Sequence, residues 1–258
     1  MTTDSAPLPT HYDRLTRAQV GEIAGEAVLV IPVGATEQHG PNLPLATDHA
    51  ICEALVTQAV DTGDFARPVV VAPTLAYGHS EHHLAFAAAS LRPATFLAVL
   101  NDLIRSAVIS GFRRVMIVNG HGGNAELIRL AVTEASNEHD GVFAALSYWD
   151  AVTEVPGGKY GVFPGHAGKY EASLLMNVRP DLLDPTTEFT AGEPRGQMQS
   201  QIGIGGRALV LRTDDWSATG GWTDDPAGSS AEDGEPYRTA IVAGLQDRIT
   251  AFCAIPIS

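Results

Sequence analysis

Val28-Leu-Val-Ile-Pro-Val-Gly-Ala-Thr-Glu-Gln-His-Gly-Pro41 is the stretch of sequence that decides the fold. It starts as a short run rich in Val and Ile that glycine and proline soon interrupt, a pattern typical of a buried strand that ends in a tight loop. The polar residues Glu37 and His39 fall in that loop, and Asp48 follows near the start of the next segment with helical spacing. We therefore expect a strand that leads polar side chains to one edge of a sheet.

The same strand-then-helix pattern continues along the rest of the chain. Short apolar runs predict three further strands, over residues 68–73, 114–119 and 142–148. Segments with helical spacing predict helices over residues 49–60, 95–110, 124–137, 166–178 and 232–254. Alternation of this kind predicts an α/β fold with three layers (α/β/α), in which helices cover both faces of a largely parallel central sheet.

Length and composition favour a single domain over residues 1–258. One domain of this length is ordinary for an α/β protein, and the 45% of hydrophobic residues is enough for one sizeable core. Residues 192–231 are rich in Gly, Ser, Thr and Asp, so we expect them to form loops and short strands that decorate the core. The two cysteines, Cys52 and Cys253, lie in apolar helix-like stretches, where buried free thiols are expected.

The chain is acidic, with 30 Asp and Glu residues against 16 Lys and Arg residues and a formal net charge of -14. A surface this negative repels phosphate backbones and anionic lipids, so we expect neither a nucleic acid nor a membrane as a partner. No run approaches the roughly 20 apolar residues that span a bilayer, and residues 1–14 lack the pattern of an export signal. These features predict a cytoplasmic protein.

The loop after the first strand is a candidate metal site. Glu37 and His39 point the same way in extended backbone, because side chains alternate with a period of two. Open α/β sheets bind their ligands at this end of the strands, and the Asp48 carboxylate can turn back toward the loop. A Glu, a His and an Asp are oxygen and nitrogen ligands that suit zinc or manganese. The alternative is that Asp48 only caps its helix while Glu37 and His39 are solvated.

A second motif, Asn119-Gly-His-Gly-Gly-Asn124, again joins a strand to a helix. Its three glycines allow a sharp turn and a close approach to a ligand. A phosphate-binding loop is the competing interpretation, but the Lys-Ser/Thr pair and the Gly-x-Gly-x-x-Gly spacing of such loops are missing. We therefore expect His121 to be a metal ligand.

A third motif, His166-Ala-Gly-Lys-Tyr-Glu-Ala-Ser173, opens the helix over residues 166–178. His166 and Glu171 are five residues apart, or about 140° around a helix, so His166 is expected in the preceding loop. A free histidine beside a metal suits proton transfer, because its usual pKa is about 6.5. Glu171 either ligates a metal or orients a ligand, and a buried salt bridge is the alternative for it.

Three further residues are candidates for contact with the substrate: His83, Asn124 and Trp149. His83 ends the histidine-rich stretch Tyr77–His83, which we expect to line the pocket, with another metal site as the alternative. Trp149 follows the last predicted strand, where its ring can stack on a planar substrate. Core packing is the alternative role for Trp149.

The three motifs together resemble the creatininase family of creatinine amidohydrolase-like enzymes. The matching segments are Gly34–Pro41, Asn119–Asn124 and His166–Ser173, with weaker matches at Gly78–Phe86, Asp225–Pro226 and Ala231–Gly234. The resemblance implies a three-layer α/β fold, a centre with two divalent metal ions, hydrolysis of an amide or cyclic amide, and a homohexamer. Family members open creatinine, deformylate a nucleotide intermediate, cleave a peptide in redox-cofactor maturation or hydrolyse an oxidised inositol.

The resemblance also implies roles for individual residues. Glu37 and His121 would hold one metal ion, His39 would hold the other, and Asp48 would bridge the two. His166 matches the proton-transfer histidine of the family.

The chain departs from the family pattern at one ligand position. Creatininase has an acidic ligand two residues after the histidine that matches His121, and this chain has Gly123 there. Glu171 is our candidate to replace that ligand. Lys169 and Ala172 replace the commoner Glu and Thr, which suggests a substrate other than creatinine.

We therefore predict a metal-dependent amidohydrolase that acts on a C–N bond of a cyclic amide or related small amide, outside ordinary peptide bonds. The resemblance implies two divalent ions, and zinc is favoured over manganese or iron. Such an ion lowers the pKa of its bound water from about 15.7 to near 7, so hydroxide is present at neutral pH. His166 would protonate the leaving nitrogen. The alternatives are the other family activities, a non-catalytic metal-binding protein, and a nucleotide-binding protein that uses Gly120–Gly123.

Overall fold

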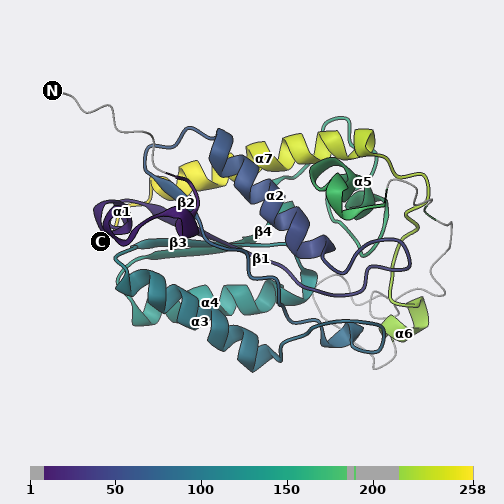
Figure 1. Cartoon of the computed structure of the whole chain (residues 1–258), viewed down its shortest axis with the longest axis horizontal. Coiled ribbons are helices and arrows are strands. Elements are labelled where there is room, and N and C mark those ends of the chain that lie inside the picture. Colours follow the sequence, from purple (N-terminus) through teal and green to yellow (C-terminus); the bar gives the residue numbers. More distant parts are fainter. Residues whose placement is uncertain (1–8, 185–188, 190–214, 258) are drawn as a thin grey trace.

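A four-stranded parallel sheet forms the centre of the computed structural model, which describes residues 9–184, 189 and 215–257 (Figure 1). The strand order is β2-β1-β3-β4, with β1 spanning Val28–Val33, β2 Val69–Val71, β3 Arg114–Asn119 and β4 Val142–Ser147. Strand β1 pairs with β3 along its whole length, from Val28 opposite Arg114 to Val33 opposite Asn119. Because all four strands run the same way, their carboxyl ends meet at one edge.

Helices cover both faces of the sheet, as the sequence predicted (Figure 1). On one face lie α2 (Thr47–Thr62), α5 (Lys169–Val178) and α7 (Ala231–Cys253). On the other face lie α3 (Pro93–Ile109) and α4 (Ala125–Glu138). Two shorter helices are α1 (Arg17–Ile23) and α6 (Asp215–Thr219), and single 3₁₀ turns span Tyr12–Arg14, Glu81–His83, Gly122–Asn124, Tyr148–Ala151 and Pro180–Leu182.

Strand β1 is apolar along its whole length because both of its faces are covered. Val28 and Val30 of β1 join the core beneath α2 and α7, whereas Leu29, Ile31 and Val33 join the core beneath α3 and α4. All six residues of β1 are buried. Such a strand reads as a continuous apolar run instead of an alternating one.

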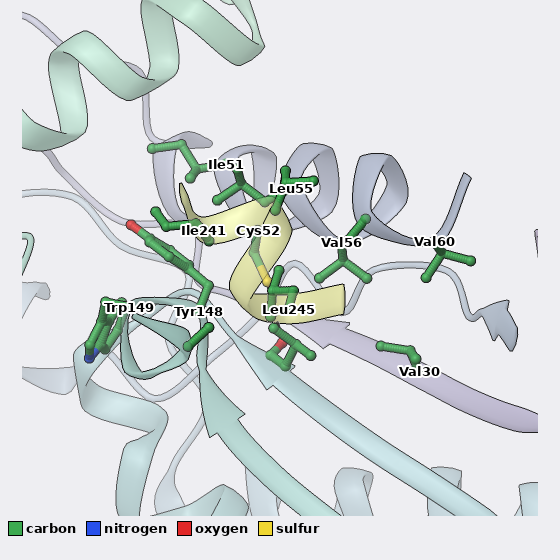
Figure 2. Close-up of a cluster of buried hydrophobic side chains, with 14 of the residues drawn as sticks. Val30, Ile51, Cys52, Leu55, Val56, Val60, Tyr148, Trp149, Ile241 and Leu245 are labelled. Atoms are coloured by element: carbon green, nitrogen blue, oxygen red, sulfur yellow. Dashed lines mark hydrogen bonds between the residues drawn. The ribbon is translucent and has the colours of Figure 1, made fainter. Parts of the chain in front are cut away.

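Figure 2 shows the core between β1, α2 and α7. Leu55 of α2 and Leu245 of α7 have no exposed surface, and Cys52 packs beside them. The Cys52 thiol donates to the main-chain oxygen of Val118 at 3.3 Å. Cys253 is also buried, and both cysteines are free, as expected.

The structure refines several predicted boundaries. Strand β2 is shorter than residues 68–73, because the prolines at both ends of that stretch lack an amide hydrogen for the ladder. Helix α5 begins at Lys169, so His166 lies in the loop before it, as its spacing from Glu171 predicted. Helix α1 was not predicted, although Thr16 and Gln19 form a capping box, a pattern readable from the sequence.

Part of the segment expected to decorate the core lies outside the described residues, namely positions 192–214. Within residues 215–230 the structure has helix α6, turns and loops, so the expected loops are present and the expected short strands are not. None of the helices in the described part of the chain combines the length and the apolarity that crossing a bilayer requires.

A substitution in strand β3 tests this packing. Ile117 of β3 has no exposed surface and belongs to the core beneath α3 and α4. We expect Ile117→Ala to lower the free energy of unfolding by about 2–5 kcal/mol, because it removes buried contacts and leaves a cavity. The matched control is Ile109→Ala at the end of α3, where the side chain is 69% exposed. Urea denaturation of both variants measures the difference, and equal losses would contradict the assigned core.

Candidate metal centre and active site

Five acidic and histidine side chains meet at the carboxyl ends of β1 and β3. Glu37 and His39 come from the loop after β1, Asp48 from the first turn of α2, His121 from the residue pair after β3, and Glu171 from the first turn of α5. None of the five is more than 4% exposed. The sequence predicted all five as metal ligands, and the fold brings them together.

The five side chains form two groups that share Asp48. In one group, the His121 Nδ1 atom lies 2.9 Å from Asp48 Oδ2 and 3.3 Å from Glu37 Oε1. In the other, the His39 Nε2 atom lies 3.0 Å from Asp48 Oδ1 and 3.8 Å from Glu171 Oε2. Each group places its ligand atoms within 4.8 Å of one another, which is close enough to hold one metal ion. The two oxygens of Asp48 thus face different groups, as in a bridging carboxylate.

The polar atoms of the site fit a divalent cation. Both carboxylate oxygens of Glu37 are buried and lack a hydrogen-bond partner. Burying a carboxylate without hydrogen bonds is costly unless a charge or a metal ion compensates it. Carboxylate oxygens and imidazole nitrogens are also the ligand atoms that zinc and manganese accept.

Main-chain carbonyls orient the two ligand histidines. The His39 Nδ1 atom lies 3.1 Å from the Glu37 carbonyl oxygen, and the His121 Nε2 atom lies 3.0 Å from the His79 carbonyl oxygen. A carbonyl only accepts hydrogen bonds, so each of these ring nitrogens donates. The opposite nitrogen of each ring is then free to face the carboxylates, which is the usual arrangement around a metal-binding histidine.

The pKa shifts of His39 and Glu171 reflect the several carboxylates that lie close together in the cluster. Burial by itself lowers the pKa of His39, but the Asp48 carboxylate, with Glu171 and Glu37, raises it to about 10. Burial also raises the pKa of Glu171 to about 8, against the opposing effect of His39. A buried cluster with these shifts favours positive charge, whether from protonated imidazoles or from cations.

His166 lies beside the two groups and forms a further possible metal-binding cluster with Glu37 and His39, as His82 and His83 do with Glu37. Its Nδ1 atom lies 3.7 Å from Glu37 Oε1, and its Nε2 atom lies 3.0 Å from the Gln38 carbonyl oxygen. Burial and the neighbouring His39 hold the pKa of His166 well below its usual range. The next residue, Ala167, has a φ of 59° and donates its amide hydrogen to Glu171 Oε2 at 2.6 Å, so one strained turn positions both His166 and Glu171.

A cavity of about 370 Å³ opens over the cluster. Its walls combine residues of the cluster with three aromatic side chains, namely Trp149 from a 3₁₀ turn, Phe163 from a loop and Trp216 from helix α6. The rings of Trp149 and Phe163 meet edge to face at 5.9 Å, and the ring of Trp216 lies 4.5 Å from that of His83. His83 and Trp149 therefore occupy the pocket wall, where the sequence analysis expected them.

Asn124 takes a different place from the one expected of it. Its side chain is fully buried and absent from the cavity wall. It donates to the Gly34 carbonyl oxygen at 3.0 Å and to Asn119 Oδ1 at 3.1 Å, and it accepts from the His79 amide at 2.9 Å. These contacts support a role in holding three loops of the site together, instead of direct contact with the substrate.

Sequence reasoning missed three residues of the site: Gln38, Phe163 and Trp216. Gln38 lies between Glu37 and His39, and its side chain contacts two histidines. Its place inside the first motif was a signal that could have found it. Phe163 and Trp216 had no such signal in the sequence, because they line the pocket through segments that lie far from the motifs along the chain.

The backbone around Gly123 explains why no acidic residue stands there. A Cβ atom on Gly123 would lie 2.3 Å from the His79 carbonyl oxygen and 2.5 Å from His121 Nε2. Both distances are shorter than non-bonded atoms allow, and the carbonyl is part of the backbone. In the second group of side chains, the carboxylate beside His39 and Asp48 comes from Glu171 on α5.

The two neighbouring glycines test this explanation. We expect Gly123→Ala to lower the melting temperature and weaken metal binding, because the new methyl group displaces the His79 carbonyl that orients His121. Gly122→Ala is the matched control, since a Cβ there meets no atom within 4 Å. Thermal unfolding with and without zinc measures both effects. Equal behaviour of the two variants would contradict the crowding at Gly123.

Comparisons with known proteins agree with this geometry. The family model "Creatininase: Creatinine amidohydrolase" matches residues 13–249. A mycofactocin precursor peptide peptidase of Mycolicibacterium smegmatis is 34% identical over 228 residues, which cover 86% of this chain and 84% of that protein.

Solved structures show the same likeness. A mutant creatininase of Zn-Zn type has a TM-score of 0.77 at 26% identity, covering 96% of this chain and 100% of that chain. A creatininase structure described as "Creatininase Mn" has a TM-score of 0.73 at 27% identity, covering 95% of this chain and 99% of that chain. The fold, the buried carboxylate–histidine cluster and these similarities together show that the chain belongs to the creatininase family of metal-dependent amidohydrolases.

Proposed function

We propose that this protein hydrolyses a C–N bond of a cyclic amide or related small amide at a centre of two divalent metal ions. The single observation that carries the proposal is the pair of ligand groups that share Asp48 beneath a cavity. Glu37, Asp48 and His121 would hold one ion, and His39, Asp48 and Glu171 would hold the other. Zinc is our first choice and manganese or iron the alternatives, and the Zn-Zn and Mn forms of solved relatives support the first two.

The bound ions would polarise the amide carbonyl and lower the pKa of a water molecule toward 7. The protein supplies the remaining parts. His166 is neutral because burial lowers its pKa, and its Nδ1 atom faces the cluster beside Glu37. It is therefore placed to take a proton and pass it to the leaving nitrogen, which otherwise leaves poorly.

The cavity wall limits the charge of the substrate. The residues that line it include carboxylates, histidines and aromatic rings, and none of them is a lysine or an arginine. An anionic group would therefore meet no fixed cation of the described chain, which disfavours a phosphorylated substrate. Trp149 and Trp216 line the cavity and would pack against a planar amide.

Cleavage of a peptide is the second candidate function. The observation that favours it is the 34% identity with a mycofactocin precursor peptide peptidase along most of both chains. The exposed ring of Phe163, at 66% exposure, would lie beside a chain that extends out of the cavity. A screen must therefore include short peptides as well as cyclic amides and formamides.

Location and assembly remain predictions. A cytoplasmic location is our proposal from the sequence. A homo-oligomer, with a hexamer implied by the family resemblance, is our expectation for the assembly. Size-exclusion chromatography with light scattering measures it directly.

The metal content of a Glu171 variant tests the second ligand group. We expect the wild-type protein to bind two equivalents of zinc and Glu171→Gln to bind one, because the amide loses the charge that balances the second ion. Elemental analysis after dialysis gives the stoichiometry. The matched control is Glu126→Gln in the first turn of α4, which lies outside the cluster and should retain both. Two tightly bound equivalents in Glu171→Gln would remove Glu171 from the ligand set.

Turnover of a His166 variant tests the proton-transfer role. We expect His166→Ala to lower kcat by about 10²–10⁴-fold, the range for losing a general acid–base group, while metal content stays at the wild-type level. Mass spectrometry of products from the cyclic amide, formamide and peptide screen measures both proteins. Full activity of the variant would remove His166 from the mechanism. Metal-loaded wild-type protein that turns over none of these substrates would favour a non-catalytic metal-binding protein.

A further inference from the structure

The carboxamide of Gln38 is the centre of a buried hydrogen-bond network. The proposed mechanism uses His166 of this network but gives Gln38 no role. Its Nε2 atom lies 2.9 Å from His83 Nδ1 and 3.0 Å from His166 Nε2, and it donates to the Gly221 carbonyl oxygen. Its Oε1 atom accepts from the Gly40 amide at 2.8 Å. Gln38 is 7% exposed, so water does not compete for these contacts.

The main chain fixes which way the carboxamide points. The Gly221 carbonyl can only accept and the Gly40 amide can only donate, so the nitrogen of the side chain faces Gly221 and the oxygen faces Gly40. A flipped carboxamide would set two acceptors against each other and two donors against each other. The orientation is therefore determined by the backbone on both sides.

The carboxamide has two protons for three neighbouring acceptor positions. The Gly221 carbonyl takes one of them. Of the two rings, only His166 has another contact for the same nitrogen, because its Nε2 atom lies 3.0 Å from the Gln38 carbonyl oxygen and can donate to it. The second proton therefore goes to His83 Nδ1, and the His166 Nδ1 atom that faces Glu37 is left without a proton.

This assignment determines the state of His83. An imidazole ring whose Nδ1 atom accepts a hydrogen bond is neutral and carries a single proton. Since Nδ1 accepts from Gln38, that proton is on Nε2. The Nε2 atom is buried, lacks a hydrogen-bond partner and lies 3.4 Å from Glu37 Oε1. His83 thus presents an unpartnered N–H donor at the cavity wall.

We propose that Gln38 is a positioning residue that holds His83 as a neutral Nε2–H donor aimed at the oxygen of the reacting amide. The proposal rests on the proposed function, because it assigns the donor a target in that reaction. Negative charge develops on the carbonyl oxygen as the amide is attacked, and a fixed donor stabilises that charge more than it stabilises the substrate. No bond to His83 forms or breaks.

Gly221 links the network to the segment that carries Trp216. Gly221 has a φ of +89°, and a Cβ atom there would lie 2.9 Å from Gln38 Nε2. Its amide donates to the Trp216 carbonyl at 3.0 Å, and the Trp216 ring packs against His83 and His166. The carboxamide and the tryptophan therefore hold the two histidine rings from different sides.

A spectroscopic experiment tests the assignment without any turnover. We expect ¹⁵N spectra of histidine-labelled, zinc-loaded wild-type protein to show His83 in a single state, protonated on Nε2 only. In Gln38→Met, which keeps the chain length and loses the donor, both His83 tautomers should be populated. The matched control is Gln246→Met, since Gln246 also donates its carboxamide to a main-chain oxygen, that of Ala59, but on α7. Wild-type His83 protonated on Nδ1 would overturn the proposal.

A double-mutant cycle tests the function of the donor. We expect His83→Phe to lower kcat/KM by about 100-fold and Gln38→Met to lower it by about 10-fold, with zinc content unchanged in both. In the double variant the Gln38 substitution should add nothing to the effect of His83→Phe, because Gln38 acts through that ring. Additive losses, or loss of zinc in Gln38→Met, would show that Gln38 acts elsewhere.

The two experiments separate this proposal from the proposed function. Absence of turnover in the wild-type protein rejects the amidohydrolase mechanism, and the ¹⁵N spectra still decide the state of His83. Turnover with the predicted cycle supports both. Turnover with an unchanged His83 state in Gln38→Met rejects the positioning role alone.

Discussion

The concentration of negative charge at the carboxyl end of the sheet is the constraint on which the rest of the site depends. Glu37, Asp48 and Glu171 are each at most 4% exposed. In each ligand group, the carboxylate oxygens and the histidine nitrogen lie within 4.8 Å of one another. Carboxylates this close and this dry repel one another and have lost their hydration. They are stable only beside positive charge, so the burial of these carboxylates favours the binding of a metal ion. The three-layer core provides the rigidity that such an arrangement needs.

Main-chain carbonyl groups orient three of the histidines at the centre. His39, His121 and His166 each place one ring nitrogen against a main-chain carbonyl oxygen, at 3.0 to 3.1 Å. The other nitrogen of each ring then faces the carboxylates. Backbone carbonyls on tight loops move less than side chains do, so the tautomers are set by the fold itself. His83 is the exception, because a side-chain carboxamide contacts its outer nitrogen.

In the proposed metal centre, the change at residue 123 moves one ligand to another element of the same fold. The family pattern implies a carboxylate after β3, and this chain has no room for a side chain there. Glu171 enters from α5 instead, and it accepts the Ala167 amide at 2.6 Å, which fixes its direction. Glu171 brings one negative charge to this edge of the parallel sheet, while the loop after β3 approaches His79.

The sequence by itself determined the fold class, the bounds of β1 and β3, and the types of ligand. Apolar runs, helical spacing and glycine-flanked polar residues are local properties, and parallel strands bring their ends to one edge wherever they occur. Only the tertiary structure decided that Asn124 ties loops together, that Trp216 lines the pocket, and that Gln38 contacts His83. These contacts join residues 45 or more positions apart, and their geometry follows from how loops pack on the finished core. Periodicity carries no information about that packing.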